Sequence, residues 1–222
     1  MSKPRRIMGS PVWAIPALIF ASPLFAPQLL AFPHSAETEL GNVRSDVPLD
    51  PEMLDRVTAR ANALVSASPL AASSERRPIF VTRGGWRWYW LANLSQGSFA
   101  ITRRVTKAVV INHTDPVSGI VRNGRAIGGE RTLSGVLAHE FTHGMIRRRY
   151  GIVGSAMLPD WKVEGYCDYV AQESSLSDDQ ARQLANEGQY HPALSYYEGR
   201  RRAADTLAQN GGSVDALFQT DK

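Results

Sequence analysis

The positions of apolar residues divide the chain into strand-like segments followed by helix-like segments. Over residues 50–67, Leu54, Val57 and Ala61 recur at three- and four-residue steps, and Pro51 occupies a first-turn position. This spacing places the apolar side chains on one face of a helix, so the segment is predicted to form an amphipathic helix.

Segments with strand character come next. Residues 79–93 are rich in aromatic side chains, and Trp86, Trp88 and Trp90 alternate as they would on one face of a strand. Two shorter predicted strands and a loop rich in Gly, Asn and Arg complete this part of the chain, at 98–102, 108–112 and 116–129.

The second half of the chain is predicted to be helical. Thr132 is a suitable N-cap for a helix from Leu133 to about Tyr150, where Gly151 would end it. Further helices are expected at 161–174, capped by Asp160, and at 177–187 and 193–209. Because the strands precede the helices, we expect an α+β domain with a short mixed sheet.

The N-terminal segment contains a long run without charge. No charged residue occurs from Ile7 to Ala36, and Lys3, Arg5 and Arg6 precede this run directly. A bilayer core requires about 20 predominantly apolar residues in a helix, and basic residues on one flank orient such a helix with that flank in the cytoplasm. The sequence therefore predicts a single-pass transmembrane helix with an extracytoplasmic C-terminal domain, which would be periplasmic in a bacterium.

A cleaved signal peptide is the alternative interpretation of this segment, and it would make the protein secreted. Signal peptides have a shorter apolar region and a small-residue cleavage site. Ala26 is followed by Pro27, and His34 occupies the position before Ala36 that favours a small residue. The uncleaved anchor is therefore preferred, and it divides the chain into a membrane segment, 1–36, and a domain, 37–222.

Charge and cysteine content exclude some classes of function. The net charge of +4 comes mainly from the first 32 residues, since without them 22 Lys and Arg face 21 Asp and Glu. A nucleic-acid-binding face is therefore not expected. A lone cysteine, Cys167, excludes an internal disulfide framework and any multi-cysteine zinc finger.

The candidate chemistry lies in the predicted helix that follows Thr132. Residues 139–143 read His-Glu-Phe-Thr-His, the H-E-x-x-H pattern. Residues four apart share a helix face, so His139 and His143 can direct their imidazole nitrogens at one zinc ion. Glu140 lies beside them, in the position of a general base that takes a proton from a zinc-bound water.

A catalytic zinc requires a third protein ligand. Glu164 lies 21 residues after His143, which allows the first helix to end and a second to present this carboxylate to the same metal. Asp168 follows one turn later, and a metal-bound histidine usually donates its second ring N–H to such a carboxylate, so Asp168 is expected to orient His139. Cys167 is interpreted as buried packing, because a fourth protein ligand would close the metal site.

The two segments His139–His143 and Trp161–Tyr169 together resemble the gluzincin zinc metallopeptidases, in particular small peptidase MA-like domains with a Pro-x-Trp-x-x-Glu-Gly segment. The resemblance covers about Leu133 to Ala171. It implies a zincin-like fold with Zn²⁺ as cofactor, His139, His143 and Glu164 as its ligands, Glu140 as general base and Asp168 as the orienting carboxylate. The Gly-x-Met-Glu-Asn segment of the large aminopeptidases is absent, so the resemblance does not extend to aminopeptidase action.

Gluzincins also need a donor that stabilises the oxyanion of the tetrahedral intermediate. Tyr197 is the residue selected for this catalytic role, with Tyr196 and His191 as alternatives.

The sequence thus predicts a membrane-anchored, extracytoplasmic zinc metallopeptidase that hydrolyses a peptide or protein substrate. The predicted strand at 108–112 would be the sheet edge on which an extended substrate lies by strand addition. Two alternatives remain: a non-catalytic zincin-fold protein that binds or scaffolds envelope components, and a zinc hydrolase of a non-peptide substrate. The sequence indicates no oligomeric state.

Overall fold

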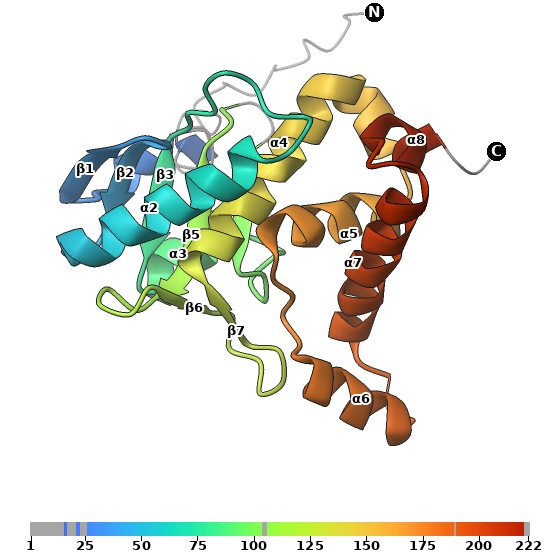
Figure 1. Cartoon of the computed structure of the whole chain (residues 1–222). Helices are drawn as coiled ribbons and strands as arrows, with labels where there is room; N and C mark the ends of the chain where they lie inside the picture. Colours follow the sequence, from blue (N-terminus) through green and yellow to red (C-terminus); the bar gives the residue numbers. More distant parts are fainter. Residues whose placement is uncertain (1–15, 17–20, 23–25, 104–105, 189, 220–222) are drawn as a thin grey trace, which may run out of the picture.

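The computed structural model describes residues 16, 21–22, 26–103, 106–188 and 190–219, and these form the α+β arrangement shown in Figure 1. The strands are β1 (His34–Thr38), β2 (Gly41–Ser45), β3 (Ile79–Thr82), β4 (Ala100–Thr102), β5 (Val109–Thr114), β6 (Ile120–Arg122) and β7 (Glu130–Thr132). The helices are the 3-10 helix Pro27–Leu30 and α2 (Pro51–Ser66), α3 (Gly85–Ala92), α4 (Leu133–Ala156), α5 (Asp160–Ala171), α6 (Asp178–Asn186), α7 (Pro192–Gln209) and α8 (Val214–Gln219).

The described strands form one mixed sheet in the order β1-β2-β3-β5-β6-β7, with β4 also paired to β5. The β2–β3 and β3–β5 pairs are parallel, and the other pairs are antiparallel. β5 is therefore an interior strand, so the prediction that residues 108–112 form a sheet edge is wrong. The short strand β4 lies at the edge instead, because β5 is its only partner among the described strands.

Alternation along the central strands builds two cores on opposite faces of the sheet. Val81 and Ile111 belong to the core on the face covered by α2 and α4. Phe80 and Val110, one position away in each strand, pack with Trp88 of α3 on the other face. Because side chains on both faces of the sheet are buried, the sequences of these strands are continuous apolar runs.

Two of the predicted helices begin in the structure where the sequence indicates. Asp50 caps α2 by accepting a hydrogen bond from the Met53 amide at 2.7 Å, and Thr132 caps α4 through the Gly135 amide at 3.1 Å. The helices expected at these two places are confirmed. α4 continues past its predicted end, but its backbone is interrupted at Gly151, whose φ of 76° and ψ of 169° are not helical.

The N-terminal prediction needs correction. No helix in the described part of the chain is long and apolar enough to cross a membrane. This finding overturns the transmembrane helix of the expected architecture and the single-pass membrane localisation inferred from it. Much of the predicted segment, residues 1–15, 17–20 and 23–25, lies outside the described residues.

The end of the same charge-free run belongs to the sheet domain. Phe32 is buried, and its ring meets that of Phe80 edge-on at 5.1 Å between centroids. β1, which contains Ala36, pairs with β2 through five residue pairs. The uncharged side chains of this part of the run therefore serve core packing and strand pairing.

The tryptophan-rich segment was also predicted wrongly, since only its first residues form a strand. β3 ends at Thr82, and the glycines Gly84 and Gly85 take positive φ values of 77° and 69°. Such values favour glycine, and they turn the chain into α3. Trp88 is buried in this helix and Trp86 is largely exposed, so the alternation of tryptophans does not mark one face of a strand.

The C-terminal helices pack so closely that glycine is required at their crossing. A Cβ added at Gly165 of α5 would lie 2.3 Å from the carbonyl oxygen of Gly199 in α7. We therefore expect Gly165→Ala to lower the free energy of unfolding by about 1–3 kcal/mol, as over-packing does elsewhere. Denaturant unfolding would measure the loss. Gly154→Ala is the control, because its Cβ would meet nothing closer than 3.7 Å, and an equal loss in this variant would contradict the explanation.

Candidate metal centre and active site

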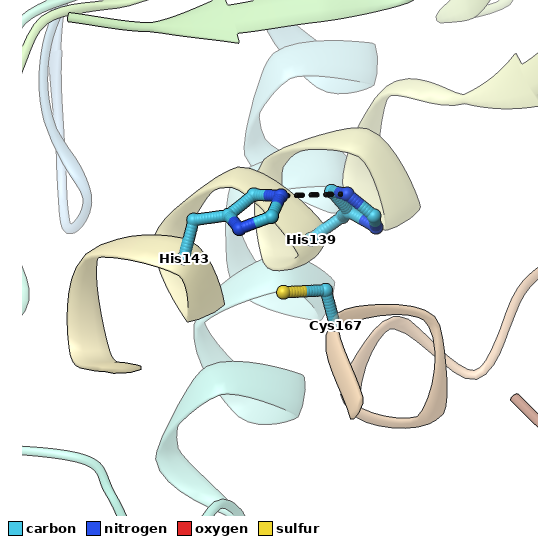
Figure 2. A group of neighbouring side chains, drawn as sticks. All are labelled: His139, His143 and Cys167. Atoms are coloured by element: carbon cyan, nitrogen blue, oxygen red, sulfur yellow. Dashed lines mark hydrogen bonds between the residues drawn. The ribbon is translucent and has the colours of Figure 1, made fainter. Parts of the chain in front are cut away.

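Two helices that pack against each other supply the site residues. α4 carries His139, Glu140 and His143 on adjacent turns, and α5 carries Glu164 and Asp168 one turn apart. Figure 2 shows the two imidazoles of α4 meeting above the side chain that α5 contributes from Cys167. The two helices pack directly against each other, which places the sequence-predicted ligands in one group.

Donor groups of three residues form a small triangle, called the donor triangle below, with the Nε2 atoms of His139 and His143 and the Glu164 carboxylate at its corners. The Nε2 atoms of His139 and His143 lie 3.1 Å apart. The Glu164 carboxylate places Oε2 at 3.3 Å from Nε2 of His139 and Oε1 at 3.4 Å from Nε2 of His143. Ligands at tetrahedral vertices around zinc, with bonds of about 2.0–2.1 Å, are separated by about 3.3–3.4 Å. The donor set and its spacing therefore fit a zinc ion.

Cys167 offers a second possible donor to the same histidines. Its ligand atom and those of His139 and His143 all lie within 4.8 Å of one another. The contacts of the Glu164 carboxylate with the two histidines, at 3.3 and 3.4 Å, are close to the spacing of zinc ligands given above. Burial, followed by the nearby carboxylates, raises the pKa of the Cys167 thiol well above its ordinary value, so the thiol stays protonated at neutral pH. A thiol must lose its proton to ligate a metal, whereas the pKa of Glu164, which burial raises, is lowered overall by the nearby histidines and its carboxylate is already ionised, so Glu164 is preferred as the third ligand.

Asp168 contacts His139 as expected from the sequence. Its Oδ1 lies 2.7 Å from Nδ1 of the imidazole and 2.9 Å from Nη1 of Arg131, and it is almost fully buried. Burial raises the pKa of Asp168, but Arg131 and His139 outweigh it and the pKa is lowered. An ionised Asp168 accepts the Nδ1–H of His139 and leaves Nε2 for a metal. Arg131 was missed in the sequence, because its partner Asp168 lies 37 residues further along the chain.

The protonation of the histidines reflects the carboxylates around them. Burial lowers the pKa of His139, but Asp168 and then Glu164 outweigh it and raise the pKa to about 10. Burial, against the charge of Glu164, lowers the pKa of His143. Without a metal, His139 therefore carries a proton, whose charge compensates the nearby carboxylates. A bound cation would compensate the same negative charge. Metal binding would displace that proton.

A residue of the sheet holds the side chain of Glu140 in place. The hydroxyl of Thr102, in the edge strand β4, donates to Oε2 of Glu140 at 2.5 Å, and Glu140 is 8% exposed. This contact fixes the carboxylate beside the donor triangle and leaves its other oxygen for proton transfer. Thr102 was missed in the sequence, because it precedes Glu140 by 38 residues and only the strand arrangement brings the two together.

A cavity of about 530 Å³ opens over this group. Thr102, Glu140, the three donor residues and Asp168 all line it, and so does the chain from Gly97 to Thr102. This volume is within the range of small-molecule and peptide-binding pockets.

The tyrosine prediction differs from the structure. The hydroxyl of Tyr197 donates to Asp178 at 2.8 Å, and Tyr197 is not among the cavity-lining residues. The neighbouring Tyr196, weighed as an alternative, lines the cavity. His191 caps α7 by accepting a hydrogen bond from the Ala193 amide at 3.2 Å, so its side chain has a structural partner.

Asp168 offers a test that does not depend on activity. Replacing it by Asn removes the charge that compensates the buried Arg131, so we expect Asp168→Asn to destabilise the metal-free protein by about 3 kcal/mol. Because the pKa of Asp168 is lowered by folding, its stabilisation is present above its unfolded pKa of about 3.9 and is lost as pH falls through the folded value. Stability measured across pH 2–7 should therefore fall less steeply on the acid side in the variant.

The control for this test is Asp179→Asn, which removes an exposed ion pair with Arg182 on α6. It should leave stability and its pH dependence unchanged. An Asp168→Asn protein as stable as the parent at neutral pH would contradict the buried-pair interpretation.

Comparisons of this chain with protein-family models, with curated proteins and with solved structures gave no match.

Proposed function

We propose that this protein is a zinc-dependent peptide hydrolase of the gluzincin type. His139, His143 and Glu164 would hold the metal, Asp168 would orient His139, and Glu140 would be the general base. The single observation that carries the proposal is the donor triangle with edges of 3.1–3.4 Å, which lies in the same cavity as an anchored Glu140. A non-catalytic binding domain has no physical need for Glu140 at this position.

When bound, zinc lowers the pKa of water and polarises a carbonyl oxygen. Glu140 takes a proton from the attacking water on the carboxylate oxygen that Thr102 leaves available. The same carboxylate then delivers the proton to the nitrogen of the leaving amine as the peptide bond breaks. Thr102 holds the carboxylate in one orientation throughout, so no rotation is required between the two transfers.

The edge strand β4 suits an extended substrate. It pairs with β5 through one edge, and the chain from Gly97 to Thr102 lines the cavity. A peptide that adds to this edge gains main-chain hydrogen bonds and passes in front of Glu140. Strand addition is thus retained from the sequence interpretation, but at β4 rather than at β5.

The test is turnover of a quenched-fluorescence peptide library by the full chain supplied with zinc. We expect hydrolysis that a chelator abolishes and that added zinc restores. Mass spectrometry of the products would identify the bond cleaved. Absence of turnover across a diverse library, in a folded protein shown to contain one zinc per chain, would favour the non-catalytic alternative or a non-peptide substrate.

A further inference from the structure

Only some of the charged residues that line the cavity take part in the proposed chemistry. Glu164 faces the two histidines, Asp168 is paired with Arg131, and Glu140 accepts a hydrogen bond from Thr102. Beyond these, the charged side chains that line the cavity are Arg125, Arg147 and Asp160.

Arg125 is the residue of this group placed to meet a ligand. It lies in the loop between β6 and β7, its side chain is exposed, and it lines the cavity. Within the described part of the chain, its guanidinium makes no hydrogen bond and no ion pair. A guanidinium presents a planar fork of N–H donors that matches a carboxylate in a bidentate pair.

The loop around Arg125 is a turn held by hydrogen bonds. The Arg125 amide donates to Oδ1 of Asn123 at 3.0 Å, and the Asn123 amide donates to the Gly129 carbonyl at 3.1 Å. A Cβ at Gly129 would lie 1.9 Å from the Arg125 carbonyl oxygen, so only glycine allows the two strands of the turn to approach. The backbone that carries Arg125 is thereby fixed relative to β6 and β7.

Two other residues that line the cavity, Gly97 and Tyr196, lie near Arg125. Gly97 lines the cavity beside the guanidinium, since a Cβ built on it would make an ordinary van der Waals contact with Nη2 of Arg125 at 3.5 Å. Tyr196 of α7 lines the same cavity and lies within electrostatic range of Arg125. Burial, and then the charges of Glu164 and Asp168, raise the pKa of Tyr196, which keeps its hydroxyl protonated as a donor.

We propose that Arg125, assisted by the hydroxyl of Tyr196, selects peptide substrates that carry a carboxylate on the α7 side of the scissile bond. This inference rests on the proposed function and names its substrate class. The carboxylate is either the side chain of an Asp or Glu residue or the C-terminus of a short peptide, since both offer the same pair of oxygens.

The kinetic test compares matched peptides with the zinc-loaded full chain. The peptides differ only by Glu or Gln at one position, scanned along both sides of the bond, and each is made with a free and an amidated C-terminus. We expect the carboxylate form to have about five- to tenfold higher kcat/KM at one position, a range suited to a partly exposed charge-assisted pair. High ionic strength should reduce this ratio.

Two variants test whether Arg125 causes the preference for a carboxylate. Arg125→Ala should bring the Glu-to-Gln ratio close to one, whereas Arg122→Ala should keep it. Arg122 lies on the same hairpin and pairs with Glu130 at 2.8 Å, and it does not line the cavity. A parent ratio near one at every position and for both C-termini, or a preference that survives in Arg125→Ala, would overturn the proposal.

A binding measurement separates this inference from the proposed function. Fluorescence anisotropy of the same peptides on zinc-loaded Glu140→Gln protein reports the carboxylate preference without hydrolysis. If no peptide is hydrolysed by the parent, the proposed function fails, and tighter binding of the Glu peptide that depends on Arg125 still supports the inference. Equal binding of the Glu and Gln peptides overturns it.

Discussion

Replacing Glu140 by Gln is expected to abolish peptide hydrolysis while zinc remains bound. The substitution keeps the shape of the side chain and a hydrogen-bonding partner for Thr102, but it removes the carboxylate that takes the proton. Loss of a positioned general base lowers kcat by about 10²–10⁴-fold. The zinc content should stay at the parent level, because Glu140 is not part of the donor triangle.

Both readouts are needed for this variant. Turnover of a peptide substrate gives the loss in kcat, and elemental analysis gives zinc per chain. Glu52→Gln is the matched control, since Glu52 is exposed in the first turn of α2, away from the cavity. Full activity in Glu140→Gln would exclude Glu140 as the base.

Replacing Glu164 by Ala is expected to have the largest effect on the metal. The substitution removes one of the three donors that meet at 3.1–3.4 Å, and a pair of histidines alone does not complete a zinc site. Loss of an outer partner of a ligand already weakens metal affinity by about 10–100-fold, so loss of the ligand itself should weaken it further. Competition with a chromophoric chelator would measure the dissociation constant.

Cys167→Ala provides the comparison that decides the ligand set. Cys167 is adjacent to Asp168 and fully buried, and its ligand atom lies within 4.8 Å of those of the histidines. If Glu164 is the third ligand, Cys167→Ala should retain zinc with nearly parental affinity. The reverse pattern, with zinc lost in Cys167→Ala and kept in Glu164→Ala, would assign the thiolate to the metal.

Local signals in the sequence were sufficient for the main helices. Pro51 in a first turn, Thr132 as an N-cap and the spacing of apolar residues are signals that involve neighbours within four positions, and the structure contains α2 and α4 where these signals placed them. The contact of His139 with Asp168 was also expected, because helical periodicity fixes which residues share a face.

Features that depend on distant segments were not predicted. The uncharged run that ends at Ala36 carries the same composition whether it packs a core or crosses a membrane, and the pairing of β1 with β2 is what distinguishes the two for its last residues. Thr102 meets Glu140 because β4 packs against α4. Tyr196 and Tyr197 differ by one position, and the rotation of α7 that decides between them is set by its packing on α5.

The division of the donor atoms between α4 and α5 has a consequence for how the protein opens. α4 contributes most of its apolar side chains to the core beneath the sheet, whereas α5 shares a second core with α7 and α8. A cation held by both helices would link these two cores, so that neither could unfold locally without losing the metal. The free energy required for such local unfolding would then increase with the logarithm of the ratio of metal concentration to dissociation constant. Amide hydrogen exchange in α5 and α7 would therefore slow with metal occupancy, so the C-terminal helices themselves report whether the site is filled.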